Sequence, residues 1–147
     1  MKKLLVLSIC SFLLLGCSKY DEGPGLSLRS KKGRITGKWN LTEVNGVNPN
    51  YYFGFSLDYY DLYMLKDGTY YRSILASSVP ILQVWDGTWE FSSDKLSFTA
   101  NGTVESSANY DIVPFSIEYE IIRLTNSELK ITSLSSGNTH TYTKETN

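Results

Sequence analysis

Over most of its length the chain alternates apolar and polar side chains, and this period of two limits most strongly how it can fold. In one segment Ile117 and Tyr119 fall on one face, whereas Ser116 and Glu118 fall on the other. Successive side chains of a β-strand point to opposite faces, so the pattern predicts strands with one apolar face. Only residues 45–58 are compatible with a short helix in this part of the chain.

Turn signals divide the alternating region into eight predicted strands. Lys66-Asp67-Gly68 is typical of a tight hairpin, and the break in phase at Ile121-Ile122 indicates a β-bulge. The polar link 101–114 is predicted as a loop. The apolar segment 79–85 either extends the fourth strand, folds over the barrel or contacts a partner. The predicted strands are 35–43, 59–66, 69–76, 86–91, 94–100, 115–124, 127–134 and 138–144.

Eight sequential strands with mostly short links favour an antiparallel up-and-down order. A single open sheet would leave two edges unpaired and would expose one apolar face to water. Closure into an eight-stranded barrel removes both problems. The outward faces are polar, the reverse of a membrane barrel. The sequence therefore predicts an all-β, eight-stranded antiparallel up-and-down barrel surrounded by water.

The N-terminus has the pattern of an export signal. Two lysines precede the apolar segment 4–15, which is too short to cross a hydrocarbon core of about 30 Å. The segment ends in Gly16-Cys17, which resembles the bacterial lipobox. That resemblance implies cleavage after Gly16 and lipidation of Cys17, and several acyl chains on one cysteine would anchor the protein durably. We therefore expect an outer-membrane lipoprotein whose partner is the membrane itself.

Three regions follow from this interpretation. Residues 1–16 are predicted as a signal peptide, 17–34 as the lipidated N-terminus with a flexible tether, and 35–145 as the barrel domain. Asp21 and Glu22 resemble the surface-export signal of lipoproteins from the Bacteroidota. The alternative is a solvated spacer, so the periplasmic face and the cell surface both stay open.

Short motifs within the barrel region resemble a known family. Gly37-Lys38-Trp39 resembles the Gly-x-Trp signature of lipocalins, in which the Trp plugs the closed end of the barrel. Asp67 to Tyr70 and Gly87 to Phe91 follow in an order similar to the lipocalin-like domain of small Bacteroidota lipoproteins. The resemblance implies a lipocalin-like, calycin-type barrel, with Gly37 and Trp39 as its signature residues. No cysteine pair accompanies these motifs.

Composition excludes several classes of function. With 14 basic and 15 acidic residues, nucleic acid is not expected as a partner. Loss of Lys2 and Lys3 with the signal peptide would leave 12 basic residues. One histidine and two cysteines, of which Cys17 would carry lipid, provide no set of metal ligands and no catalytic thiol. Glu118 and Glu120 share an outward face, so this pair of carboxylates is not expected to carry out acid/base catalysis. We expect no enzyme activity, no cofactor and no metal.

Aromatic residues supply the candidate site. The chain contains 11 Tyr, 6 Phe and 3 Trp, and seven of these rings lie within residues 51–63. In a lipocalin-like barrel this segment would be the lid over the open mouth, where rings could contact a ligand or simply cap the core. The candidate ligand-binding residues are Tyr51, Tyr52, Phe53, Tyr60, Trp85 and Tyr119.

Two functions remain open at this stage. The first is a monomeric binding protein that holds a small apolar or amphipathic ligand in or at the mouth of the barrel. The second is a structural or interaction lipoprotein with a filled barrel, which contacts another component of the cell envelope. The volume of the interior discriminates between them, because a cavity of a few hundred Å³ favours the first.

Overall fold

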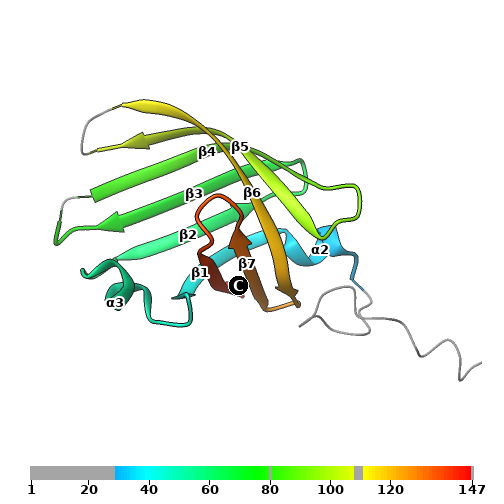
Figure 1. Cartoon of the computed structure of the whole chain (residues 1–147), viewed down its shortest axis with the longest axis horizontal. Coiled ribbons are helices and arrows are strands. Elements are labelled where there is room, and N and C mark those ends of the chain that lie inside the picture. The colour runs from blue at the N-terminus through cyan, green and yellow to red at the C-terminus, as the bar shows by residue number, and fades with distance from the viewer. Residues whose placement is uncertain (1–28, 80, 108–110, 147) are drawn as a thin grey trace, which may run out of the picture.

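The structure is a computed structural model that describes residues 29–79, 81–107 and 111–146. Eight antiparallel strands form a closed barrel in sequential order, so the predicted fold class is confirmed (Figure 1). The strands are β1 Gly37–Val44, β2 Tyr59–Met64, β3 Thr69–Ala76, β4 Ile81–Phe91, β5 Ser97–Ser106, β6 Ile112–Leu124, β7 Glu128–Ser133 and β8 Thr139–Lys144. Two short helices accompany them, α2 Lys31–Ile35 and α3 Pro49–Phe53.

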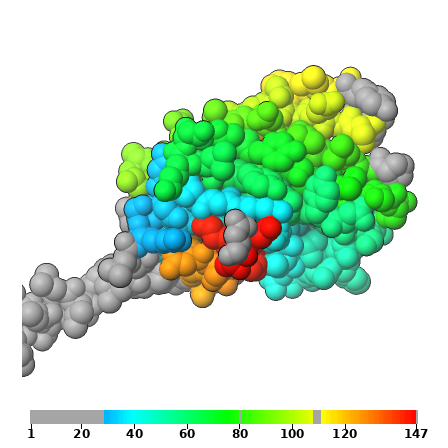
Figure 2. Space-filling model, turned by 180° about the vertical axis from the view of Figure 1, so that it is seen from behind, coloured from blue at the N-terminus to red at the C-terminus, as the bar shows by residue number. Residues whose placement is uncertain are grey.

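The first strand closes the barrel by pairing on both sides. Gly37 to Asn40 pair with β2, whereas Trp39 to Val44 pair with β8. Figure 2 shows β1 and β8 side by side from behind. The core includes residues from Ile35 to Tyr142, so a chain that begins at Ser18 contains all of it. No helix in the described ranges is long and apolar enough to cross a membrane.

The helices lie at opposite ends of the barrel (Figure 1). At the α2 end, Trp39 is fully buried, and its indole Nε1 donates to the carbonyl of Ile35 at 2.7 Å. The Lys144 ammonium lies 4.7 Å from the Trp39 ring centroid and donates to the Arg34 carbonyl at 2.7 Å. Gly37 has a φ of +143°, and the Lys144 side chain occupies the space that a Cβ would need. Gly37 and Trp39 are thus in close contact with Lys144 and with the end of α2 at this end of the barrel.

Side chains fill the half of the barrel that α2 covers. The rings of Trp89 and Phe98 meet edge to face with centroids 6.3 Å apart, and Phe98 stacks on Tyr119 at 5.1 Å. Such pairs add to the stability that burial of their area supplies. The largest side chains with almost no exposure are Trp39, Tyr70, Tyr142, Phe98, Ile35 and Leu62.

The predicted tether and the start of the first strand need correction. Residues Lys31–Ile35 form α2, although 31–34 were predicted as flexible and residue 35 as strand. The Ser30 side chain caps the helix by accepting from the amide of Gly33 at 3.0 Å. Ile35 is fully buried among the core residues, and Arg34 donates to the carbonyl of Leu124 at 3.2 Å. These contacts hold the segment under the barrel. The lipidation residue Cys17 lies outside the described residues.

The predicted loop 101–114 is also wrong, because β5 continues to Ser106 and β6 begins at Ile112. In residues 101–106 the side chains alternate between exposed and half-exposed, so no buried face imposes the apolar pattern that predicts a strand. Of the interpretations of 79–85, strand extension is the one observed, from Ile81 onward. The predicted bulge is confirmed by a register shift between Ile121 and Arg123. The helix allowed within 45–58 is α3.

Candidate functional site

A cavity of about 340 Å³ occupies the end of the barrel that α3 borders. Its wall includes Ile74 on β3, Trp85 on β4 and Ile117 on β6, which alternation turns inward. Polar side chains, among them Gln83 and Asn138, contribute to the rest of the lining. The barrel is therefore filled at the α2 end and hollow at the opposite end, which we call the mouth.

Five of the six predicted ligand-binding residues line this mouth cavity. They are Tyr52, Phe53, Tyr60, Trp85 and Tyr119. Phe53 stacks on Tyr60 with ring centroids 6.4 Å apart, so the last residue of α3 packs against the second strand. Tyr51 lies outside the cavity, because the short helix turns it outward and leaves it 83% exposed. The structure thus brings together residues from α3, β2, β4 and β6.

The sequence interpretation missed Arg72, which lies at the base of the mouth cavity. Its side chain is only 8% exposed and points inward from β3. Nη1 donates to the Tyr119 hydroxyl at 3.1 Å, and the guanidinium carbon lies 3.7 Å from the centroid of the Trp85 ring. Nε is buried and has no hydrogen-bond partner among the described residues. A charged group therefore sits on the otherwise apolar face of a strand.

A signal for Arg72 was present in the sequence. One face of the third strand carries Tyr70, Arg72, Ile74 and Ala76. All of these except Arg72 are residues that a barrel interior accepts. A basic residue in phase with them must either enter the barrel or break the alternation. Charged side chains are rarely buried without a partner, so the alternation of the third strand marks Arg72 as a candidate site residue.

Tyrosine hydroxyls surround the guanidinium but remain uncharged. Burial raises the pKa of Tyr60, and it raises the pKa values of Tyr70 and Tyr142 well above the usual value. The charge of Arg72 acts in the opposite direction and does not cancel the effect of burial. At neutral pH these phenols are therefore neutral hydrogen-bonding groups and supply no negative charge.

The single histidine also lines the mouth cavity. Burial lowers the pKa of His140 to about 4, with a further contribution from the charge of Arg72. The imidazole stacks on the Tyr142 ring at 6.3 Å between centroids, and its buried Nδ1 has no partner among the described residues. His140 is thus neutral at pH 7 and offers a polar nitrogen to the cavity without a second positive charge.

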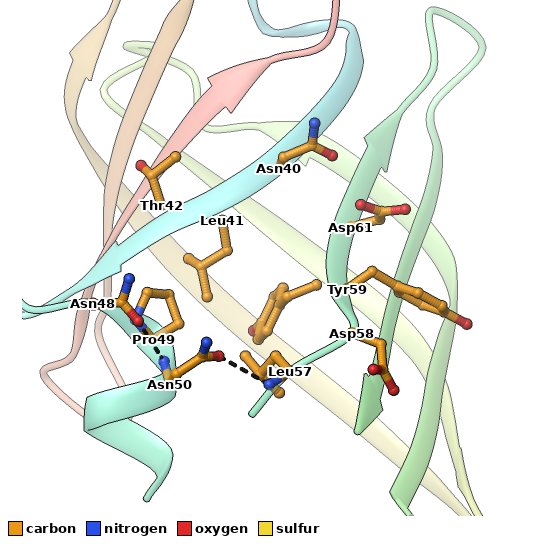
Figure 3. A pocket seen from close by; sticks show the side chains of 11 residues that line it. Asn40, Leu41, Thr42, Asn48, Pro49, Asn50, Leu57, Asp58, Tyr59 and Asp61 are labelled. Atoms are coloured by element: carbon orange, nitrogen blue, oxygen red, sulfur yellow. Dashed lines mark hydrogen bonds between the residues drawn. The ribbon is translucent and has the colours of Figure 1, made fainter. Parts of the chain in front are cut away.

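A larger hollow of about 520 Å³ lies outside the mouth cavity, where β1 and β2 separate beyond the Asn40–Asp61 pair (Figure 3). Polar groups of this hollow form structural contacts. The backbone amide of Asn50 donates to Asn48 Oδ1 at 2.9 Å, and the backbone amide of Leu57 donates to Asn50 Oδ1 at 2.9 Å (Figure 3). These bonds hold α3 and the segment after it. We therefore regard the mouth cavity, whose buried polar atoms lack partners, as the candidate site.

The acidic residues beside the aromatic segment have structural partners as well. Asp58 accepts from the Ser77 amide at 2.7 Å and from its hydroxyl at 2.5 Å, and these bonds lower the pKa of Asp58. Asp61 lies 3.2 Å from the Lys38 ammonium on the outer face. Within the described ranges, no three His, Cys, Asp or Glu side chains are grouped as a metal site would require.

Comparison with known proteins gives one match. The family described as the lipocalin-like domain matches residues 35–131, from the end of α2 through most of β7. The matched range includes Gly37, Trp39 and Arg72. No curated protein and no solved structure matches the chain.

Proposed function

Because the chain belongs to the lipocalin-like domain family, we propose that it is a binding protein that holds a small amphipathic ligand in the mouth cavity. The observation that carries the proposal is an inward-facing cavity that combines aromatic walls with buried polar atoms lacking partners. Ligand sites in proteins are typically concave, mostly apolar and furnished with a few polar groups that orient the ligand. The mouth cavity has each of these properties.

The size of the cavity supports binding over the alternative of a filled barrel. Its volume of about 340 Å³ lies near the lower end of the range of about 300–1,000 Å³ for small-molecule sites. Ile74, Trp85 and Ile117 supply apolar walls, and Gln83 with Asn138 supplies hydrogen-bonding groups. A protein that used only its outer surface would gain nothing from an unfilled interior, since unfilled space lowers stability.

Native mass spectrometry after incubation with an organic-solvent extract of bacterial envelopes tests this proposal. The chain that begins at Ser18 is compared with Ile117→Trp, which fills the cavity, and with Ser116→Trp, which adds the same ring to the outer face. We expect one reproducible small-molecule adduct on the unmodified chain and on Ser116→Trp, and none on Ile117→Trp. No adduct on the unmodified chain, or an adduct that Ile117→Trp retains, contradicts the proposal.

The location and oligomeric state belong to the same proposal. We infer a monomer that acts without a cofactor and without catalysis, anchored to the outer membrane through lipid on Cys17. The lipobox-like Gly16-Cys17 supports the anchor. Metabolic labelling with tritiated palmitate tests it: we expect label on the full chain and none on Cys17→Ser. Label that persists in Cys17→Ser contradicts the anchor and leaves ligand binding untouched.

The side of the membrane has its own test. If Asp21 and Glu22 direct export to the cell surface, Ala substitution of both should remove protease accessibility on intact cells. Accessibility that persists in the double variant contradicts export by these residues.

A further inference from the structure

The charge of Arg72 points to the chemical class of the ligand. Resting on the proposed function, we propose that the ligand is a monoanion whose carboxylate, or oxyanion of similar size, pairs with the Arg72 guanidinium, while its apolar body extends along the cavity wall toward the rim. The geometry at the base of the cavity carries this inference.

Arg72 is a buried cation whose described neighbours do not neutralise it. An arginine side chain stays protonated at any pH that proteins experience, so burial cannot remove its charge. Its described contacts include the Tyr119 hydroxyl, the face of Trp85 and the Tyr60 ring, whose centroid lies 5.9 Å from the guanidinium carbon, and it forms no ion pair with a described carboxylate. A cation–π contact and a neutral acceptor compensate only part of the cost of removing a charge from water.

The acidic residues beside the aromatic segment already have partners other than Arg72. Asp58 accepts two hydrogen bonds from Ser77, and Asp61 faces Lys38 on the outer surface. Tyr60, Tyr70 and Tyr142 are neutral at pH 7, because burial raises their pKa values, as described above. No carboxylate in the described ranges pairs with Arg72, and in this proposal a bound molecule supplies the negative charge at the base of the cavity.

The guanidinium retains bonding capacity for such a molecule. Nη1 donates to Tyr119, whereas the buried Nε has no acceptor among the described residues. Nε belongs to a guanidinium edge that can donate two parallel hydrogen bonds to one carboxylate. Trp85 lies against one face of the group at 3.7 Å, which holds the guanidinium plane in place for in-plane bonding.

The remaining lining sets the charge and shape of the ligand. His140 is neutral at pH 7, so the cavity presents one positive charge, which fits one negative charge. Ile74, Ile117 and Phe53 line the space around Arg72 and match an apolar body. With about 340 Å³ available, that body is a ring with a short chain rather than a sterol or a phospholipid.

A matched pair of probes tests the inference on the chain that begins at Ser18. 4-Phenylbutyrate carries a carboxylate, and 4-phenylbutyramide has nearly the same shape without the charge. By isothermal titration at pH 7 we expect the acid to bind at least tenfold more tightly than the amide, since charge-assisted hydrogen bonds exceed neutral ones in strength. Arg72→Gln should remove this preference by weakening the acid at least tenfold, with little change for the amide.

Two further variants serve as controls. Arg123→Gln removes one positive charge from an outward ion pair with Glu128, so it should leave the preference for the acid unchanged. Arg72→Lys keeps a charge at the base of the cavity, and it should retain part of the preference. If Arg72→Gln does not fold, the comparison of Arg72→Lys with the unmodified chain still measures the dependence on the guanidinium.

The pKa of His140 supplies a second measurement. If Arg72 had only a structural role, adding the acid probe would not change this pKa. His140 is the single histidine, so its imidazole signals in proton NMR are unambiguous. Arg72 and Tyr142 face it, and the charge of Arg72 helps to lower its pKa to about 4. A bound carboxylate would offset that charge, so 4-phenylbutyrate should raise the pKa of His140 by a measurable fraction of a unit, and the amide should not.

The outcomes separate this inference from the proposed function. Equal affinities for the acid and the amide, or a preference that Arg72→Gln retains, overturn the anionic ligand and leave cavity binding in place. Binding of neither probe at millimolar concentration, together with no adduct in the mass spectra, contradicts both. A tenfold preference for the acid that depends on Arg72, together with a rise in the pKa of His140 when the acid binds, supports both.

Discussion

The pH dependence of stability offers a quantitative test of the environment assigned to His140. The perturbation is a decrease in pH from 7.5 to 4.5, applied to the chain that begins at Ser18 and to His140→Gln. Burial, with the charge of Arg72, holds the pKa of the folded His140 at about 4, whereas an unfolded histidine titrates near 6.5. Between these values the unfolded chain binds a proton that the folded chain does not, so acid favours unfolding.

The size of the effect follows from the two pKa values. The contribution of the neutral His140 is complete above pH 6.5 and is lost as the pH falls toward about 4. Each unit of difference between the two pKa values corresponds to about 1.4 kcal/mol, so the full loss is about 3.5 kcal/mol as an upper limit. By pH 4.5 most of that loss should have occurred, before the carboxylates with lowered pKa values, such as Asp58 and Asp67, are protonated.

Urea unfolding followed by tryptophan fluorescence measures the effect at half-unit steps of pH. The difference in unfolding free energy between the unmodified chain and His140→Gln should shrink or change sign as the pH falls from 6.5 to 4.5, by roughly 2–3 kcal/mol. Above pH 7 the difference should be constant. A difference that stays flat across pH 6.5–4.5 would refute the buried position of His140 beside Arg72.

Three more predictions concern the frame of the barrel. Trp39→Ala should lower the free energy of unfolding by about 3–5 kcal/mol in urea titrations, because the ring is fully buried at the closed end; a loss below 1 kcal/mol would contradict its role there. Gly87→Ala should cost at least about 3 kcal/mol, because its Cβ would overlap the Asn101 carbonyl across the sheet. Gly54→Ala, with open space around it and a φ of +76°, should cost only about 1–2 kcal/mol, and equal costs for the two variants would refute the close approach. Asp58→Asn should accelerate hydrogen exchange at the Ser77 amide, and unchanged exchange would contradict their bond.

The sequence predicted the barrel well because strand alternation reports burial directly. Closure of the barrel makes one face of each strand apolar at the filled end, and Trp39, Trp89 and Phe98 carry that signal. The same reasoning failed at residues 101–114, where the strands line the open end. There the inner face is not packed, so the alternation that depends on packing is weak.

The candidate site was predicted only in part, for a related reason. Of the seven rings in residues 51–63, those of Tyr52, Phe53 and Tyr60 line the mouth cavity, and Trp85 and Tyr119 reach it from the strands. Tyr51 could not be separated from Tyr52 because the orientation of a five-residue helix depends on its packing against the barrel. The alternation of the third strand turns Arg72 inward, but its contact with the Tyr119 hydroxyl, 47 positions away in the sequence, depends on the register of the barrel.

Binding at the mouth, rather than elsewhere on the barrel, is tested most directly by the three tryptophan indole signals in a ¹⁵N–¹H NMR titration with 4-phenylbutyrate. Trp85 lines the mouth cavity, whereas the indoles of Trp39 and Trp89 donate to the carbonyls of Ile35 and Leu65 at the filled end. The Trp85 signal, assigned through Trp85→Phe, should shift and saturate while the other two stay in place. A Trp85 signal that does not respond at millimolar probe, or shifts confined to Trp39 and Trp89, would contradict a binding site at the mouth.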